Sequence, residues 1–453
     1  MYKRTWDWWR YSDRLADEVR QCTEEGRDVG AWLPEVDAIM ASRNGPDKEE
    51  RARAALVGME RVPVGPGFAY DQPVSHAGIV ASLPADHRQT YEVDESRLRD
   101  RLRGAFTGRA AGCLLGIPVE GWTRERIAGF ARDSGQWPLT RYLSSAVPDD
   151  VRTMYGVHDD DPGTPYDRTR VCWIDNVAEY PVDDDMNYTM SALRVFERYG
   201  PGFTSYDVAE SWLYSLPVLH TCTAERVAYQ NILNQVTPPE SGVYLNPYRE
   251  WIGAQIRADV YGYAAPGHPA RAAEYAYRDA VVSHTANGVY GAMYIAALLS
   301  LAATDADMGV TVAAAMGQIP PGSRLAEGLR DVVTRHGAGD GFDALVTRVY
   351  ELYDPTRFFD WCSVIPNAML VTAACLCFPD DFGAGICNVV LAGFDTDCNG
   401  ATVGSVLGMR LGLAGVDPRW TTGLGQVMNT SVSGYHRVTI DDAAERVLAV
   451  IRS

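Results

Sequence analysis

The segment GFDTDCNGATVGSVLG, residues 393–408, decides the fold prediction because its later glycines recur at every fourth position. Residues four apart lie on one face of a helix. A glycine inside a helix costs roughly 0.5–1 kcal/mol relative to alanine, so a glycine face is worth keeping only where another backbone approaches closely. Two series in the chain have this spacing: Gly104, Gly108, Gly112 and Gly116, then Gly400, Gly404, Gly408 and Gly412. We therefore expect two buried helices in close contact.

Helical spacing dominates the chain from Ser96 onward. In MNYTMSALRVFERYG, residues 186–200, the apolar side chains recur at intervals of three and four, which is typical of an amphipathic helix. Only VTRVYELY and ICNVVLAGF, residues 346–353 and 386–394, could also be strands. We predict an all-α fold, a compact multi-helix bundle. We divide it into an N-terminal extension at 1–95 that packs on the main domain and a catalytic domain at 96–453.

Composition limits the classes of function. The 453 residues carry a net charge of −18, which repels polyanions, so we expect no nucleic-acid partner. The longest apolar run, GAMYIAALLSLAA at 291–303, is too short to cross a bilayer. The first residues lack the apolar core of a secretory signal. We expect a soluble cytoplasmic protein with no membrane partner, whose nine cysteines are reduced.

Acidic residues gather at predicted helix ends. Three clusters stand out: Glu120 after the first glycine series, Asp183, Asp184 and Asp185 before the helix at 186, and Asp395 and Asp397 before the second series. One aspartate is enough to cap a helix, and neighbouring carboxylates repel each other. A hard divalent cation explains the excess, because Mg²⁺ and Mn²⁺ prefer oxygen ligands. If the glycine helices are antiparallel, Glu120 lies at the same end as Asp395 and Asp397, with a bend near Cys398 and Asn399 bringing the two aspartates together. Two clusters that meet across a core could hold two metals.

The chain resembles the ADP-ribosylglycohydrolase superfamily, of the dinitrogenase-reductase-activating glycohydrolase type, over roughly residues 100–450. The resemblance rests on five segments: GAFTGRAAGCLLGIPVE, DDDMNYT, GAQIRADVYG, SHTANGVYGAMYIAALL and GFDTDCNGATVGSVLG. It implies an all-α domain with a two-metal centre, usually of Mg²⁺ or Mn²⁺. It also implies a hydrolase that cleaves the ribosyl C1 bond of an ADP-ribosylated or ribosylated substrate.

The resemblance also implies site residues. The metal ligands would be Asp183, Asp184, Asp185, Asp395, Asp397 and Cys398. The substrate would contact Gly116, Glu120, Gly253, Arg257 and His284. Three positions depart from the family pattern, because Asp183 stands where the family has a hydroxyl residue, Cys398 where it has threonine, and Cys113 where it often has aspartate.

The chemistry of these residue types fits such a reaction. Cleavage of a glycosidic bond passes through an oxocarbenium-like state, and a carboxylate can activate the attacking water or steady the cation. We assign this catalytic role to Glu120, Asp184 and Asp185. In so acidic a protein an anionic ligand needs local positive charge, and we expect it from Arg249, Arg257 and the loop at 253–262.

Two other functions compete with the hydrolase. The segment FDTDCNG also resembles the nucleophile motif of haloacid-dehalogenase-type phosphatases, with ICNVVLAGF as its leading strand. A scaffold that keeps the fold without catalysis is the second alternative. Within the hydrolase interpretation, the partner is either a ribosylated small molecule or an ADP-ribosylated protein. The long N-terminal extension could roof a closed pocket, which favours the small molecule.

Overall fold

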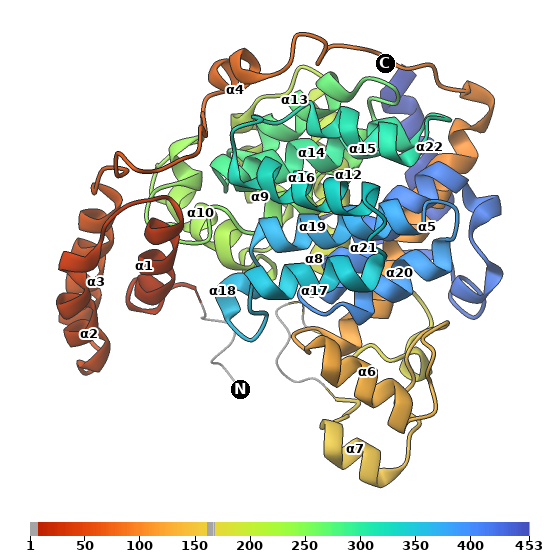
Figure 1. Ribbon diagram of the computed structural model, residues 1–453, viewed down its shortest axis with the longest axis horizontal. Coiled ribbons are helices and arrows are strands. Elements are labelled where there is room, and N and C mark those ends of the chain that lie inside the picture. Colours follow the sequence, from red (N-terminus) through yellow and green to blue (C-terminus); the bar gives the residue numbers. More distant parts are fainter. Residues whose placement is uncertain (1–7, 161–165, 167, 453) are drawn as a thin grey trace.

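The computed structural model describes residues 8–160, 166 and 168–452, and this part of the chain is almost entirely helical (Figure 1). Its helices pack into one large apolar core, and a smaller core lies under the N-terminal segment. The two segments that could have been strands, at 346–353 and 386–394, lie mainly in helices α17 (Phe342–Leu352) and α20 (Phe382–Leu391). The prediction of an all-α fold is confirmed.

Two helices form the centre of the molecule. They are α5 (Glu95–Gly116) and α21 (Thr396–Leu411), which make the most extensive helix pair in the fold and run antiparallel. An ideal Cβ on Gly108 would lie 1.9 Å from the carbonyl oxygen of Gly404, and one on Gly112 would lie 1.8 Å from that of Gly400. Each glycine thus lets a backbone approach where no side chain fits, and the predicted contact is confirmed.

The ends of α21 differ in two details from the sequence expectation. Gly412 lies just beyond α21 as its C-cap, with φ of 75°, so it ends the helix rather than continuing its glycine face. The bend before α21 also lies earlier than Cys398 and Asn399. Gly393 and Phe394 adopt positive φ values of 77° and 59°, and the helix has already begun at Thr396.

The other helices surround this pair. In the main body they are α8 (Asp184–Tyr199), α9 (Ser205–Ser215), α10 (Thr223–Leu233), α11 (Gly253–Ile256), α12 (Asp259–Tyr263), α13 (Pro269–Ala280), α14 (Ala286–Ala302), α15 (Met308–Met316), α16 (Arg324–Gly337), α17 (Phe342–Leu352), α18 (Phe358–Trp361), α19 (Val364–Cys377), α20 (Phe382–Leu391) and α22 (Ile440–Arg452). Two short strands, β1 (Val427–Asn429) and β2 (Arg437–Thr439), pair antiparallel just before α22. No helix in the described ranges is long and apolar enough to cross a membrane.

Two groups of short helices extend from this body in Figure 1. One projects below it and consists of α6 (Arg124–Asp133) and α7 (Asp149–Tyr155). The other belongs to the N-terminal segment, in which α1 (Leu15–Glu24), α2 (Leu33–Ala41) and α3 (Pro46–Glu60) lie at one side, near α10, and α4 (His76–Ser82) lies beyond them along the top of the view.

All nine cysteines are free thiols.

Candidate active site

A cavity of about 990 Å³ lies at the end of the central helix pair where α5 stops and α21 starts. Among the residues predicted for the site, the cavity is lined by Glu120, Asp183, Asp184, Gly253, Asp395, Asp397 and Cys398. Four others, Gly116, Asp185, Arg257 and His284, are buried behind these lining residues. The fold thus brings the three acidic clusters together, although they are separated by up to 277 positions in the sequence.

The close contact of α5 and α21 places the first pair of clusters. A Cβ on Gly116 would lie 2.3 Å from the backbone nitrogen of Asp397, and the Thr396 hydroxyl donates to the Gly116 carbonyl at 2.9 Å. The short 3-10 helix Ile117–Val119 then carries the chain to Glu120. Carboxylate oxygens of Glu120, Asp395 and Asp397 all lie within 4.8 Å of one another. This distance is short enough for one cation to be shared by the three side chains.

Side chains of the core hold the Asp395 turn. The Asn367 carboxamide oxygen accepts from the backbone N–H of Asp395 at 3.3 Å and from the Asn399 side chain at 2.7 Å. The Trp361 indole donates to the carbonyl of Phe394 at 2.7 Å. The turn is therefore fixed on both sides, and Asp395 and Asp397 face the same cavity although they are alternate residues.

The start of α8 provides the remaining carboxylates. Asp183 is the N-cap, whose side chain accepts from the backbone N–H of Asp185, and it also accepts from Arg168 at 2.8 Å. Asp184 lines the cavity. Ligand atoms of Asp184, Asp185, Asp397 and Cys398 form a second group within 4.8 Å of one another, and Cys113, Asp183 and Asp185 form a third.

Asp185 belongs to a buried ion-pair network. Its Oδ1 accepts from Arg109 at 2.8 Å, and the same guanidinium donates to Asp259 at 2.7 Å. All three side chains are fully buried. The other oxygen of Asp185, Oδ2, has no hydrogen-bond partner among the described residues. Arg109 thus orients Asp185 through one oxygen and leaves the second for another ligand.

Burial and mutual repulsion dominate the electrostatics of the site. Burial, reinforced by the other carboxylates, raises the pKa of Asp184 and Asp395 well above the ordinary range. The pKa of Asp397 is raised to about 6 by the same two causes. Buried carboxylates packed in this way need a compensating cation or protons.

The residues present fit a divalent metal. Two buried oxygens, Oδ2 of Asp185 and Oδ1 of Asp397, have no hydrogen-bond partner in the described part of the chain, and such orphans are rare in folded proteins. The donor set is mostly carboxylate oxygen, which suits Mg²⁺ or Mn²⁺. The two cysteines suit these ions less well, because burial raises the pKa of Cys113 and Cys398 and keeps both thiols neutral.

Glu225, which the sequence motifs did not indicate, lies next to Gly253, Arg257 and His284. Glu225 of α10 lines the cavity, and a Cβ on Gly253 would lie 2.3 Å from its Oε1. Arg257 donates to Glu225 at 2.5 Å and is also paired with Asp279. Its charge is therefore neutralised behind the cavity wall.

His284 lies behind the same wall. The Oε1 of Glu225 lies 3.9 Å from Nδ1 of His284, which shares a 2.8 Å hydrogen bond with the Ser283 hydroxyl. Burial lowers the pKa of His284 well below its ordinary value, so its imidazole is neutral. Substrate contacts by Arg257 and His284 stay predictions. Both side chains lie next to Glu225, which lines the cavity, so they can affect the cavity by positioning Glu225.

The expectation for Arg249 is wrong. Its side chain does not line the cavity but is buried between Glu18 of α1 and Glu25, the C-cap of α1, at 2.7 Å from each. Among the described residues, the arginines that line the cavity are Arg126 and Arg168. Both lie outside the motifs that carried the resemblance, so no motif pointed to them.

Comparisons with known proteins identify the class. The family model for ADP-ribosylglycohydrolase matches residues 94–453, and the chain belongs to that family. A solved structure described as an ADP-ribosylglycohydrolase-related protein complex is 20% identical, covers 79% of this chain and 99% of its own, and has a TM-score of 0.45. No curated protein matches the chain in sequence. Most members of this family are enzymes.

The fold also decides against one alternative. A haloacid-dehalogenase-type phosphatase needs a strand before its aspartate motif and alternating strands and helices throughout. Here ICNVVLAGF lies mostly in α20, and only two three-residue strands occur in the described residues. The phosphatase interpretation is therefore wrong.

Proposed function

We propose that this protein is a metal-dependent hydrolase that cleaves the ribosyl C1 bond, N- or O-glycosidic, of a ribosylated substrate. The observation that supports it most strongly is the convergence of Glu120, Asp184, Asp395 and Asp397 on one cavity of small-molecule size. Family membership supports the reaction class. Two divalent cations, Mg²⁺ or Mn²⁺, would be held by the carboxylates of Asp183, Asp184, Asp185, Asp395 and Asp397 and would polarise ribose hydroxyls and bound water.

The protein side chains have distinct tasks in this proposal. Glu120 is exposed at the cavity edge, where it can accept a proton from an attacking water or stabilise positive charge at the ribosyl C1. Asp184 faces the same cavity and is a second candidate for this task. Arg109 holds the Asp185 carboxylate in one orientation, so we assign to Asp185 the positioning of a bound cation.

Product analysis tests the proposal. The protein is incubated with ADP-ribosyl-arginine, ADP-ribosyl-serine, NAD and nucleosides, with Mg²⁺, with Mn²⁺ and with chelator. We expect ribose or ADP-ribose to be released from at least one compound, only in the presence of metal. Glu120→Gln should lower turnover about 100-fold or more, because it removes a proton acceptor, while Glu125→Gln, an exposed glutamate nearby on α6, should not.

The outcomes separate the remaining alternatives. Release that does not depend on metal would contradict the metal-assisted reaction. No release from any compound, with either metal, would favour the non-catalytic scaffold.

A further inference from the structure

We infer that the N-terminal extension is a wall of the substrate cavity and restricts the enzyme to low-mass ribosides, with Trp8 and Asp17 as specificity-determining residues. This inference rests on the proposed function. The family model begins at residue 94, so the extension is an addition to the family's domain. Three side chains of the extension, Trp8, Asp13 and Asp17, nevertheless line the same cavity as the metal-type aspartates.

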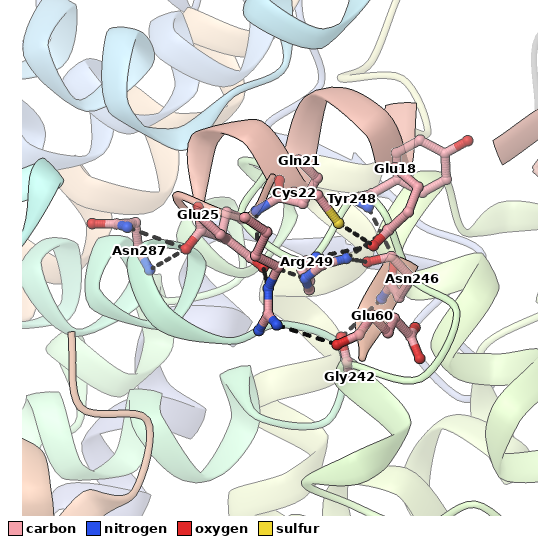
Figure 2. Close-up of polar contacts among 12 residues, drawn as sticks. Glu18, Gln21, Cys22, Glu25, Glu60, Gly242, Asn246, Tyr248, Arg249 and Asn287 are labelled. Atoms are coloured by element: carbon pink, nitrogen blue, oxygen red, sulfur yellow. Dashed lines mark hydrogen bonds and ion pairs between the residues drawn. The ribbon is translucent and has the colours of Figure 1, made fainter. Parts of the chain in front are cut away.

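A buried ion-pair network fixes the extension to the main domain (Figure 2). The guanidinium of Arg249 lies 2.7 Å from Glu18 and 2.7 Å from Glu25, and all three side chains are largely buried. The Glu60 carboxylate accepts from the backbone N–H of Leu245, whose side chain joins the small apolar core of α1–α3. Removing a partner of a buried pair is costly, so this contact holds α1 in one position.

Trp8 is held on the cavity by two arginines. The guanidinium of Arg14, fully buried, donates to the Trp8 carbonyl at 3.0 Å through Nε, and also to the Leu245 carbonyl at 3.2 Å. The guanidinium of Arg226 in α10 lies 5.7 Å from the centroid of the Trp8 ring, which is within the range of a cation–π contact. The indole is therefore a fixed part of the cavity.

Asp17 reaches the cavity beside an aromatic residue of the main domain. Tyr248 is 1% exposed, lines the cavity and is hydrogen-bonded to Asp17. Burial raises the pKa of Asp17 to about 6, and the Tyr248 hydroxyl moderates that rise. Neither Asp13 nor Asp17 belongs to the described groups of residues that could hold a metal. The Asp17 carboxylate lines the cavity outside these groups, so it can accept a hydrogen bond from the part of the substrate that lies away from the metals.

The size of the cavity supports a low-mass substrate. Its volume of about 990 Å³ lies at the upper end of the roughly 300–1,000 Å³ typical of small-molecule sites. A modified side chain on a folded protein needs an open approach for the attached backbone, and here the extension occupies one side. A low-mass riboside fits better, particularly one whose leaving group has a flat face for Trp8 and a hydrogen-bond donor for Asp17.

Paired substrates with the same bond test the inference. Free ADP-ribosyl-arginine is compared with a protein ADP-ribosylated on arginine, and free ADP-ribosyl-serine with a protein carrying that linkage. NAD and nucleosides complete the low-mass set. The parent should cleave a low-mass compound and leave both proteins intact. Trp8→Ala and Asp17→Ala should raise KM for that compound about tenfold, with kcat changed less than about threefold, because they remove binding contacts and not reacting groups.

Matched variants control for general damage. Asp37→Ala, on the exposed surface of α2, and Trp137→Ala, an exposed tryptophan that does not line the cavity, should leave KM unchanged. Equal melting temperatures of Trp8→Ala, Asp17→Ala and parent verify folding. The inference is overturned if KM is unchanged in both variants, or if the parent cleaves a modified protein as fast as its low-mass counterpart.

Failure of the proposed function is recognised separately. If the parent cleaves nothing, the hydrolase proposal fails, and calorimetric binding of ADP-ribose then decides the inference. Binding about tenfold weaker in Trp8→Ala and Asp17→Ala supports the wall. Equal binding in all proteins, or none in the parent, overturns it.

Discussion

The buried carboxylates of this protein are of two kinds. Those of the first kind are neutralised by a buried arginine, as Asp259 is by Arg109 and Asp279 by Arg257. Those of the second kind, the buried Asp395 and Asp397 and the half-buried Asp184, have no arginine or lysine within ion-pair distance in the described part of the chain and lie close to one another. Buried carboxylates are costly without a compensating positive charge. A bound cation is the simplest source of that charge for this group.

Glu60 allows a prediction for single-residue electrostatics. Burial raises its pKa from 4.5 to about 7, so between these values the folded protein holds a proton that the unfolded chain has lost. The stability from this group is complete below pH 4.5 and is lost as pH rises through about 7. Glu60→Gln, which cannot titrate, should therefore gain stability relative to the parent between pH 5 and 8, on the order of 1–2 kcal/mol after allowance for partial solvent exposure.

Urea unfolding at several pH values measures this difference. Glu50→Gln, on the exposed surface of the same helix, serves as the control and should follow the parent at every pH. A difference between Glu60→Gln and parent that does not change with pH would contradict the assignment.

At the scale of elements, the α5–α21 pair sets the geometry of the site. A Cβ added at Gly404 would lie 2.0 Å from the backbone oxygen of Gly108, and a backbone cannot rotate away as a side chain can. Gly404→Ala should therefore push the helices apart and destabilise the protein by about 1–3 kcal/mol, although alanine is the better helix former. Chemical denaturation of the variant measures this loss.

A second glycine separates packing from helix propensity. Gly337 ends α16, and a Cβ there would meet nothing within 4 Å. Gly337→Ala should be neutral or stabilising by up to about 1 kcal/mol. If Gly404→Ala is no less stable than Gly337→Ala, close backbone contact is not what the glycines provide.

The glycine spacing also shows why this part of the fold could be predicted. A four-residue period of small residues has a direct geometric meaning, so the sequence indicates both the helix face and a close partner. Once the helices are taken as antiparallel, it also indicates that Glu120 lies near Asp395 and Asp397. Glu225 and Arg168 could not be found in this way, because each is a single charged residue whose position depends on long-range packing. Arg249 was misplaced for the same reason, since its partners Glu18 and Glu25 lie more than 220 residues away.

At the scale of the whole molecule, the cavity is assembled from segments spread over the chain. Trp8 and Asp17 come from the extension, Glu225 from α10, and Asp397 from α21. No segment contains a complete site, so folding of the entire chain is required to bring the carboxylates together. Repulsion among these carboxylates opposes folding. A bound divalent cation would remove this repulsion, so we expect added metal to stabilise the protein.

Calorimetric titration with Mn²⁺ tests whether the converging aspartates form a divalent-metal centre. The parent should bind Mn²⁺. Asp397→Asn should lose at least one binding event, since Asp397 belongs to two of the groups of possible ligands. Asp150→Asn, an exposed aspartate on α7, should bind like the parent. Equal Mn²⁺ binding by the parent and Asp397→Asn would contradict the account.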